Sequence, residues 1–578
     1  MSNNPDAPTF LDRLRVLYGE RATEIAPQVE ALVDEYRTSD SASSSALWSE
    51  RDVVLITYAD ILRSEQASPL STLCQWMVER GHAERINVVH LLPFCPYSSD
   101  DGFSVIDYLA VDPEAGTWND IAKLGEAVDL MFDLVLNHIS QHSEWFQKYL
   151  AGESPYDRFF VEADPTIDWS QVVRPRSLPL LTEVQTSRGP RHVWTTFSDD
   201  QIDLNYEEPE VLLRMLQVLL EYAKRGARII RLDAIAFLWK EQGTNCLHLP
   251  ETHEAVKLMR DVVAAALPGT ILLTETNVPH QENVSYFGSG DEAQMVYQFS
   301  LPPLLLDAMT SGDAVYLRNW LANLAPPPAG CTFFNFTASH DGIGVRPLEG
   351  LVPDERLEAV VAAVRARGGR INTRRRPDGT DAPYELNITY VDAVSPTTAD
   401  EPAEVELHAR RFLTTQAVML SLPGMPAVYF HSLVGTQNDY AGVEQSGINR
   451  RINRHKYDLP ELEQHLSGDN SLAARIHQGY EQLLAVRTAH PAFHPEAAIT
   501  LLDTSSDAVL AVERVSLDGD ERIIALANFG PEVTLPLAAF AGTATQFRSL
   551  LADDPSLLPA DGSITLPAGG SAWLLERS

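Results

Sequence analysis

Short apolar runs recur along the chain and alternate with segments of helical periodicity. The run 227–237, ARIIRLDAIAF, is apolar at Ile229, Ile230, Leu232 and Ile235. Such a nearly unbroken run is typical of a strand buried on both faces of a parallel sheet. Similar runs occupy residues 53–57, 86–94, 130–138, 227–234, 270–276, 295–299, 332–340 and 427–431. Helical patterns, for example 209–223 and 253–266, fill most of the gaps. Eight strands alternating with helices predict an α/β fold, a (β/α)8 TIM barrel.

Several segments fall outside this alternation. Residues 10–36 have an amphipathic helical pattern, and residues 139–205 carry many Pro, Asp and Trp with little clean periodicity. Residues 342–410 include GGRINTRRRPDGTDAPYELN, which we interpret as a long loop, and loops of that length are usually functional. From about residue 497 short alternating strands with turns predict a small antiparallel domain. The predicted domains are a helical extension (1–50), the barrel (51–138 and 206–495), an inserted subdomain B (139–205), a long active-site loop region (342–410) and a C-terminal β domain (496–578).

Two charges, Arg231 and Asp233, interrupt the apolar run near its C-terminal end. A buried Asp is costly unless it is paired or takes part in chemistry. Catalytic groups of barrel enzymes lie at that end of the strands. Catalysis and a purely structural Asp–Arg pair are both compatible with this strand on its own.

Further polar residues end the other predicted strands. Asn137 and His138 close the third, Glu275 follows the fifth, and His340 and Asp341 follow the seventh. Isolated acids are usually solvated or paired, but three acids converging on one barrel mouth favour a catalytic site. Two carboxylates about 5–5.5 Å apart suffice for double displacement at a sugar carbon, one as nucleophile and one as acid/base.

The motifs DLVLNH (133–138), RLDAIAF (231–237), LLTETN (272–277) and ASHDGIG (338–344) resemble, in this order, the α-amylase superfamily of glycoside enzymes. The resemblance covers the chain from about residue 51 to its end. It implies that Asp233 is the nucleophile, that Glu275 is the general acid/base, and that Asp341 holds sugar hydroxyls and stabilises the transition state. It also implies glucose-binding or supporting roles for His138, Arg231 and His340.

Other segments resemble the sucrose-phosphorylase-like branch: LITYAD (55–60), LLPFCPYSSDDGFSVIDY (91–108), VVRPRSLPLLT (172–182), VWTTFSDDQIDLN (193–205), GTNC (243–246) and NRRINRH (449–455). This resemblance implies that Asp100 and Arg450 close a pocket for one glucose, and that Phe103 and Phe197 pack on the sugar. Two more residues match positions that contact phosphate in that branch: Arg176 and Tyr384. Arg suits phosphate because it offers paired donors; without the resemblance, a surface ion pair explains Arg176 equally well. The implied product is α-D-glucose 1-phosphate.

The acceptor site departs from that of sucrose phosphorylases. Asn277 stands where they have a His, and Ala382-Pro383-Tyr384-Glu385 replaces the Tyr-Gln of their mobile loop. Pro175 and Tyr384 replace an Arg and a His that sucrose 6-phosphate phosphorylases can use. The run 274–304 instead resembles glucosylglycerate and glucosylglycerol phosphorylases.

We therefore expect a retaining phosphorylase that takes a small-molecule α-glucoside, preferably glucosylglycerate, together with inorganic phosphate. Glucosylglycerol fits as well, because Glu385 would repel glycerate. A cation for glycerate could come from Arg374, Arg375 or Arg376, although these may equally be solvated loop charges. Sucrose or sucrose 6-phosphate phosphorolysis and an α-glucosidase or transglucosidase remain alternatives. A non-catalytic carbohydrate-binding protein would have lost at least one of the three acids.

Composition restricts the partners. The chain has 80 acidic and 44 basic residues, a net charge of −36, which argues against nucleic acid and anionic membranes as partners. Basic residues are nearly all Arg, which fits either a saline cytoplasm or GC-rich coding. The four Cys form no CxxC pair and predict reduced core thiols. With no targeting segment or long apolar run, a soluble, cytoplasmic protein is expected.

Asn137 matches a residue that binds calcium in many amylases. The phosphorylase branch is not expected to need that metal, so the sequence predicts no metal site and no cofactor. The oligomeric state cannot be read from the sequence.

Overall fold

The computed structural model describes residues 8–38, 46–175, 178–375, 380–395, 401–468, 471–541, 547–551 and 562–577, with the side chain of residue 375 left out. At its centre eight parallel strands close into a barrel in the order β1-β16-β12-β11-β10-β9-β4-β3, which confirms the predicted fold class. Their bounds are β1 Val54–Thr57, β3 Val88–Leu91, β4 Asp129–Val135, β9 Ala227–Asp233, β10 Ile271–Thr274, β11 Met295–Tyr297, β12 Thr332–Phe336 and β16 Met425–Tyr429. Each coincides with one of the eight predicted runs.

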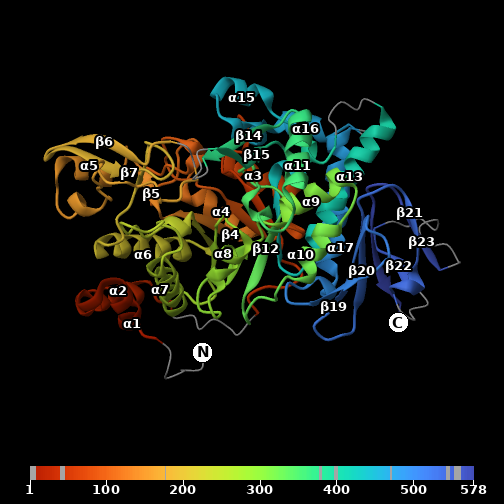
Figure 1. The fold of residues 1–578 in the computed structure, drawn as a ribbon, viewed down its shortest axis with the longest axis horizontal. Helices are drawn as coiled ribbons and strands as arrows, with labels where there is room; N and C mark the ends of the chain where they lie inside the picture. The colour runs from red at the N-terminus through yellow and green to blue at the C-terminus, as the bar shows by residue number, and fades with distance from the viewer. Residues whose placement is uncertain are drawn as a thin grey trace.

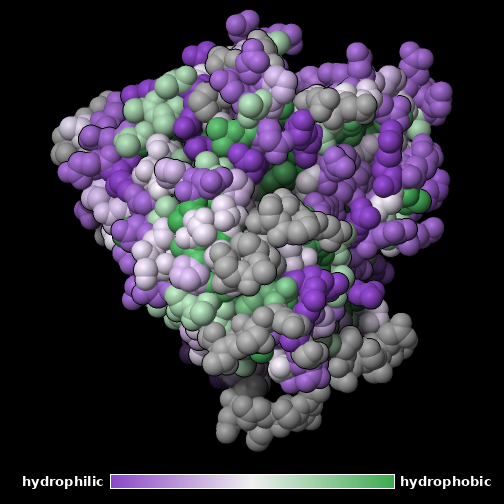
Figure 2. Space-filling model, turned by 90° about the vertical axis from the view of Figure 1, so that its right-hand side faces the viewer, coloured by the Kyte–Doolittle hydropathy of each residue, from purple (hydrophilic) through white to green (hydrophobic). Residues whose placement is uncertain are grey.

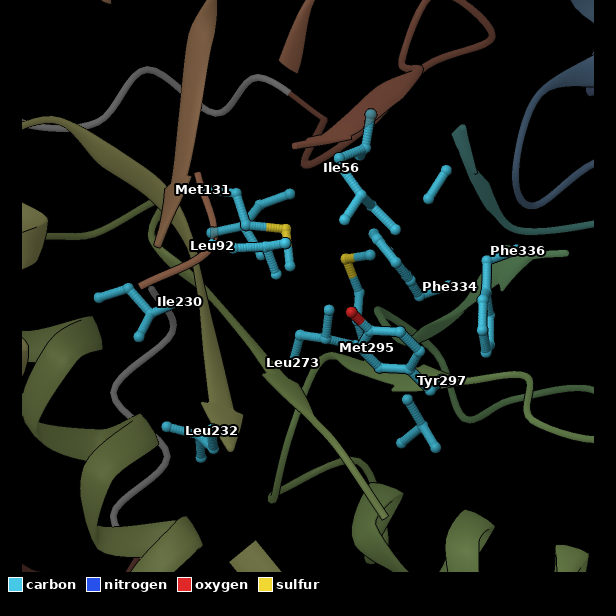
Figure 3. Packing of buried hydrophobic residues seen from close by; sticks show 14 of the residues in the cluster. Ile56, Leu92, Met131, Ile230, Leu232, Leu273, Met295, Tyr297, Phe334 and Phe336 are labelled. Carbon is cyan, nitrogen blue, oxygen red and sulfur yellow. The ribbon is translucent and has the colours of Figure 1, made fainter. Parts of the chain in front are cut away.

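Apolar side chains from the strands fill the barrel (Figure 3). Ile56, Met131, Leu273 and Met295 come from four different strands and are fully buried. Burying one such side chain contributes about 1.5–3 kcal/mol to folding. The packed interior therefore leaves the carboxyl ends of the strands as the place for a cavity.

Helices surround the barrel (Figure 1). They include α3 Pro69–Glu79, α4 Trp118–Ala127, α6 Pro209–Lys224, α7 Pro250–Ala266, α9 Leu301–Ser311, α13 Pro402–Ser421 and α17 Leu472–Ala489. The N-terminal segment forms two helices, α1 Phe10–Tyr18 and α2 Ala22–Tyr36, because Gly19 ends the first with a φ of 56°. Arg13 of α1 bonds Glu254 and Asp261 of α7 at 3.2 and 3.0 Å, which fastens the extension to the barrel.

Two excursions lie over the barrel mouth. Residues 139–205 contribute the pair β6 Leu181–Thr186 with β7 Gly189–Trp194, and β8 Gln201–Asp203, which pairs with β5 His138–Ser140. The second excursion contains a three-stranded sheet in the order β13-β15-β14, close to α15 Tyr440–Ser446 at the top of Figure 1. Its strands are β13 Ile343–Gly344, β14 Arg370–Arg375 and β15 Asp381–Asn387.

The interpretation of GGRINTRRRPDGTDAPYELN as a loop was wrong. This segment forms the antiparallel pair β14–β15. The two strands show no alternation of apolar and polar residues, because some of their buried side chains are polar and form hydrogen bonds with one another. Glu385 is 2% exposed and accepts a 3.1 Å hydrogen bond from the Asn372 amide across the two strands.

The C-terminal region forms a five-stranded antiparallel sheet, β18-β19-β20-β24-β22, with a smaller pair, β21–β23, beside it (Figure 1). The bounds are β18 Ala498–Leu502, β19 Val509–Val515, β20 Arg522–Asn528, β21 Val533–Pro536, β22 Phe547–Ser549, β23 Ser563–Leu566 and β24 Ser571–Glu576. Hydrophilic side chains dominate the outline of the face in Figure 2, as the net charge suggests. Within the described residues no helix has both the length and the apolar character to cross a membrane.

Candidate active site

A cavity opens at the carboxyl ends of the barrel strands. All but one of the fourteen predicted site residues line it: Asp100, Phe103, His138, Phe197, Arg231, Asp233, Glu275, Asn277, His340, Asp341, Tyr384, Glu385 and Arg450. The exception, Arg176, lies outside the described residues, as does Arg376. The cavity thus collects side chains from the carboxyl ends of β4, β9, β10 and β12, from the loops after β3 and β16, and from both excursions.

Asp233 and Glu275 lie on either side of one guanidinium group. Arg231 Nη1 donates to Asp233 Oδ1 at 2.8 Å, and Arg231 Nη2 lies 3.8 Å from Glu275 Oε2. Ala234 follows β9 with a φ of 51°, and its N–H donates to Glu275 Oε2 at 3.0 Å. This left-handed residue turns the chain directly after Asp233. The Glu275 side chain therefore joins the ends of β9 and β10, in addition to the backbone hydrogen bonds between the two strands.

Arg231 is itself fixed from behind. It is 2% exposed and bonds Asp133 of β4, whose other oxygen lies 2.7 Å from His90 Nε2 of β3. Burial alone would raise the pKa of Asp133, but Arg231 and His90 outweigh it and hold that pKa at about 2. A permanently charged carboxylate therefore anchors the guanidinium beneath the two acids. Asp133 was not among the predicted site residues, although an acid inside an apolar strand is the signal that identified Asp233.

Burial raises the pKa of both Asp233 and Glu275. The negative charge of Glu275 raises the pKa of Asp233 further, and the negative charge of Asp341 raises the pKa of both groups. Arg231 opposes this effect at both groups. Because Arg231 touches Asp233 at 2.8 Å and Glu275 only at 3.8 Å, it favours the charge on Asp233. The pair is therefore suited to hold one proton, on Glu275, in front of an ionised Asp233.

Asp341 is oriented by two neighbours. Arg450 Nη1 lies 2.7 Å from Asp341 Oδ1, and His340 Nε2 lies 3.5 Å from the same oxygen. The remaining side of the Arg450 guanidinium binds Glu385 through two bonds of 3.1 and 2.8 Å. The Gly342 N–H donates to Glu385 Oε1 at 3.1 Å. Glu385 is therefore neutralised by Arg450, and its carboxylate is occupied rather than free to repel an anionic acceptor.

Aromatic and imidazole rings form one wall of the cavity. Phe103 stacks on His340 with ring centroids 4.6 Å apart and planes 7° apart. Phe197 lies 5.1 Å from the His138 ring, and His138 Nε2 is 2.9 Å from the Phe103 carbonyl oxygen. Burial lowers the pKa of both His138 and His340, so both are neutral hydrogen-bonding groups. Asp100 lies beside this wall in a left-handed conformation, with a φ of 53°.

The position matched to a calcium ligand contacts a protein cation. Lys240 Nζ donates to Asn137 Oδ1 at 2.7 Å and lies 2.8 Å from Asp203 Oδ2. Asp203 is fully buried, and Lys240 supplies the positive charge that it needs. The oxygen atoms of Asn137 and Asp203 thus bind the ammonium group of Lys240.

Asn277 and Tyr384 form a further part of the cavity wall. A Cβ at Gly344 would lie 2.5 Å from Asn277 Oδ1, so only glycine lets the chain approach this amide. Burial raises the pKa of Tyr384 to about 12, so its phenol remains a neutral donor. The lining residues that the sequence did not predict include Arg346 and Asn453. Neither ends a strand of the barrel, so no periodicity identified them.

Comparison with known proteins agrees with this architecture. The family described as "Alpha amylase, catalytic domain" matches residues 85–322. The chain is 48% identical to the glucosylglycerate phosphorylase of Allomeiothermus silvanus over 89% of its length and 91% of that protein. The chain belongs to the α-amylase family. It is also 49% identical to the glucosylglycerate phosphorylase of Escherichia coli, over 82% of this chain and 84% of that protein. The crystal structure of sucrose 6F-phosphate phosphorylase from Thermoanaerobacter thermosaccharolyticum superposes with a TM-score of 0.72 at 28% identity, over 84% of this chain and 94% of that one.

The two relatives are thus matched over most of their own length.

Proposed function

We propose that the protein is a retaining disaccharide phosphorylase, a hexosyltransferase that converts 2-O-α-D-glucosylglycerate and phosphate reversibly to α-D-glucose 1-phosphate and glycerate. The observation that carries this proposal is the pair of buried carboxyl groups, Asp233 and Glu275, on one guanidinium in one cavity. The relatives named glucosylglycerate phosphorylase, 48% and 49% identical, support the choice of substrate.

In the first half-reaction the Asp233 carboxylate attacks the anomeric carbon of the glucosyl unit. The bond from that carbon to the glycerate oxygen breaks, and the proton of Glu275 passes to this oxygen. A β-glucosyl-enzyme and free glycerate result. Asp341, oriented by Arg450, accepts hydrogen bonds from sugar hydroxyls, which become stronger donors as positive charge develops on the ring.

In the second half-reaction a phosphate oxygen attacks the same carbon and releases Asp233. The Glu275 carboxylate accepts the proton of that phosphate hydroxyl, which restores the acid. Two inversions retain the α configuration. Arg176 and Tyr384 are the residues that we propose for phosphate, the first on the resemblance alone and the second supported by its place on the cavity wall.

We propose that the glucose lies against the wall of aromatic and imidazole rings. Phe103 and Phe197 contact the sugar, and Asp100, His138, His340 and Arg450 bind its hydroxyls or support these contacts. The stacking of Phe103 on His340 supports this arrangement, because it presents a preformed apolar face beside polar groups.

A substrate panel tests the proposal. Glucosylglycerate, glucosylglycerol and sucrose are incubated with and without phosphate, and glucose 1-phosphate and free glucose are measured. Glucose 1-phosphate formed from glucosylglycerate only when phosphate is present supports the proposal. Free glucose released at equal rates in both conditions would instead indicate a glucosidase on the same scaffold.

A further inference from the structure

The cavity contains an arginine whose guanidinium group makes no hydrogen bond among the described residues. Arg231 and Arg450 each contact at least two carboxylates there, but Arg346 approaches only Glu349, at 3.9 Å. That Glu349 oxygen is bonded by Arg374 at 2.7 Å. The Arg346 side chain is 15% exposed, and its Nε is buried without a partner. Arg346 therefore presents a largely buried positive charge that is only weakly compensated.

Arg346 lies on the wall formed by Asn277 and Tyr384. Gly344, two residues earlier, packs directly on the Asn277 amide. The next residue, Val345, donates its N–H to the Tyr384 carbonyl oxygen at 3.1 Å. The positive charge of Arg346 also acts on the Tyr384 phenol, where it opposes the effect of burial on the pKa. The guanidinium thus borders the side of the cavity assigned to the leaving group.

We propose that Arg346 binds the carboxylate of an anionic acceptor and so selects glycerate over glycerol. This inference rests on the proposed function. A guanidinium forms two parallel bonds to a carboxylate, and the bonds are strong where solvent is restricted. An incompletely paired buried cation is unfavourable in the empty enzyme, and a bound carboxylate relieves that cost. Glu385 does not oppose the acceptor, because Arg450 neutralises it.

The test compares the wild type with Arg346→Gln in the synthetic direction, with glucose 1-phosphate as donor and glycerate or glycerol as acceptor. Phosphate is released in both reactions. The ratio of the two kcat/KM values therefore reports the contribution of the acceptor carboxylate. Loss of a hydrogen bond to a charged group predicts a fall in kcat/KM for glycerate of about 10–100-fold. With glycerol kcat/KM should change by less than about threefold. Partial recovery of the glycerate rate in Arg346→Lys would add support.

Arg365→Gln, on the exposed face of α11 Asp354–Ala366, is the matched control and should leave the ratio unchanged. An equal loss for both acceptors in Arg346→Gln would overturn the inference, because it would place the arginine on phosphate or in the framework. A changed ratio in Arg374→Gln but not in Arg346→Gln would also overturn it. If the wild type is active but Arg346→Gln leaves the ratio unchanged, this inference alone is rejected. A wild type that forms no glucose 1-phosphate from glucosylglycerate rejects the proposed function itself.

Discussion

Two walls of the same cavity are built in different ways. The first wall, which carries Asp233 and Glu275, consists of strand ends in the barrel ladder, where Leu232 pairs with Thr274. The second wall comes from β15, in the second excursion, and from η8 Asn449–Asn453, which follows β16 and belongs to neither excursion. It is held by side chains, above all by the pair between Glu385 and Arg450.

The difference teaches where the enzyme can vary. Main-chain register positions the first wall, so the two acids keep their spacing whatever occupies the loops. Ion pairs position the second wall, and these can be exchanged without moving the barrel. We therefore expect changes in the first wall to abolish chemistry, and changes in the second to alter stability, acceptor choice or pH dependence.

The largest effect is expected for Asp233→Ala, which removes the proposed nucleophile. By analogy with nucleophile replacements in other enzymes, kcat for glucose 1-phosphate release should fall by about 10⁴-fold or more. The exposed Asp503→Asn variant serves as control and should remain fully active. Substantial turnover by a folded Asp233→Ala protein, checked by circular dichroism, would remove Asp233 from the mechanism.

Glu275→Gln should lower kcat for glucosylglycerate by about 10²–10⁴-fold, the usual contribution of acid–base catalysis. With α-glucosyl fluoride, whose leaving group needs no proton, formation of the glucosyl-enzyme should be slowed much less. Single-turnover measurements on both donors separate the two cases. The exposed Glu65→Gln variant is the control, and equal losses with both donors would contradict the acid role.

Glu385→Gln tests the second wall. It removes a buried carboxylate from Arg450 while leaving Asp341 as a partner, so the free energy of unfolding should fall by about 3 kcal/mol, the lower end of the range for breaking buried pairs. Chemical denaturation measures this loss, with the exposed Glu401→Gln as control. Activity should fall less than in Asp233→Ala, because this variant leaves both acids of the first wall in place on the intact barrel strands. Unchanged stability would show that the pair does not hold this wall.

The smallest effect is a shift of the pH profile. Burial raises the pKa of Glu275, and the negative charge of Asp341 raises it further. The acid must be protonated, so kcat/KM for glucosylglycerate should be present below the upper pKa of the Asp233–Glu275 pair and lost as pH rises through it. Asp341→Asn removes a negative charge and should move this alkaline limb to lower pH in the residual activity. A shift to higher pH would contradict the charge coupling.

The sequence analysis failed where structure depends on partners distant in the chain. The β14–β15 pair was taken for a loop, because its buried side chains are polar and satisfy one another. The sequence leaves Glu385 as a free acceptor-site carboxylate, because its partner Arg450 lies 65 positions away, beyond β16. Arg346 was missed because it ends no barrel strand.

The sequence by itself determined the barrel and the position of its acids. Buried parallel strands need continuous apolar runs, and a charge at the end of such a run stands out without any knowledge of the fold. Only the tertiary structure decided which charges neutralise each other. Which charges pair depends on the distances between side chains of segments far apart in the chain. Neither the periodicity of the sequence nor the spacing of its residues determines those distances.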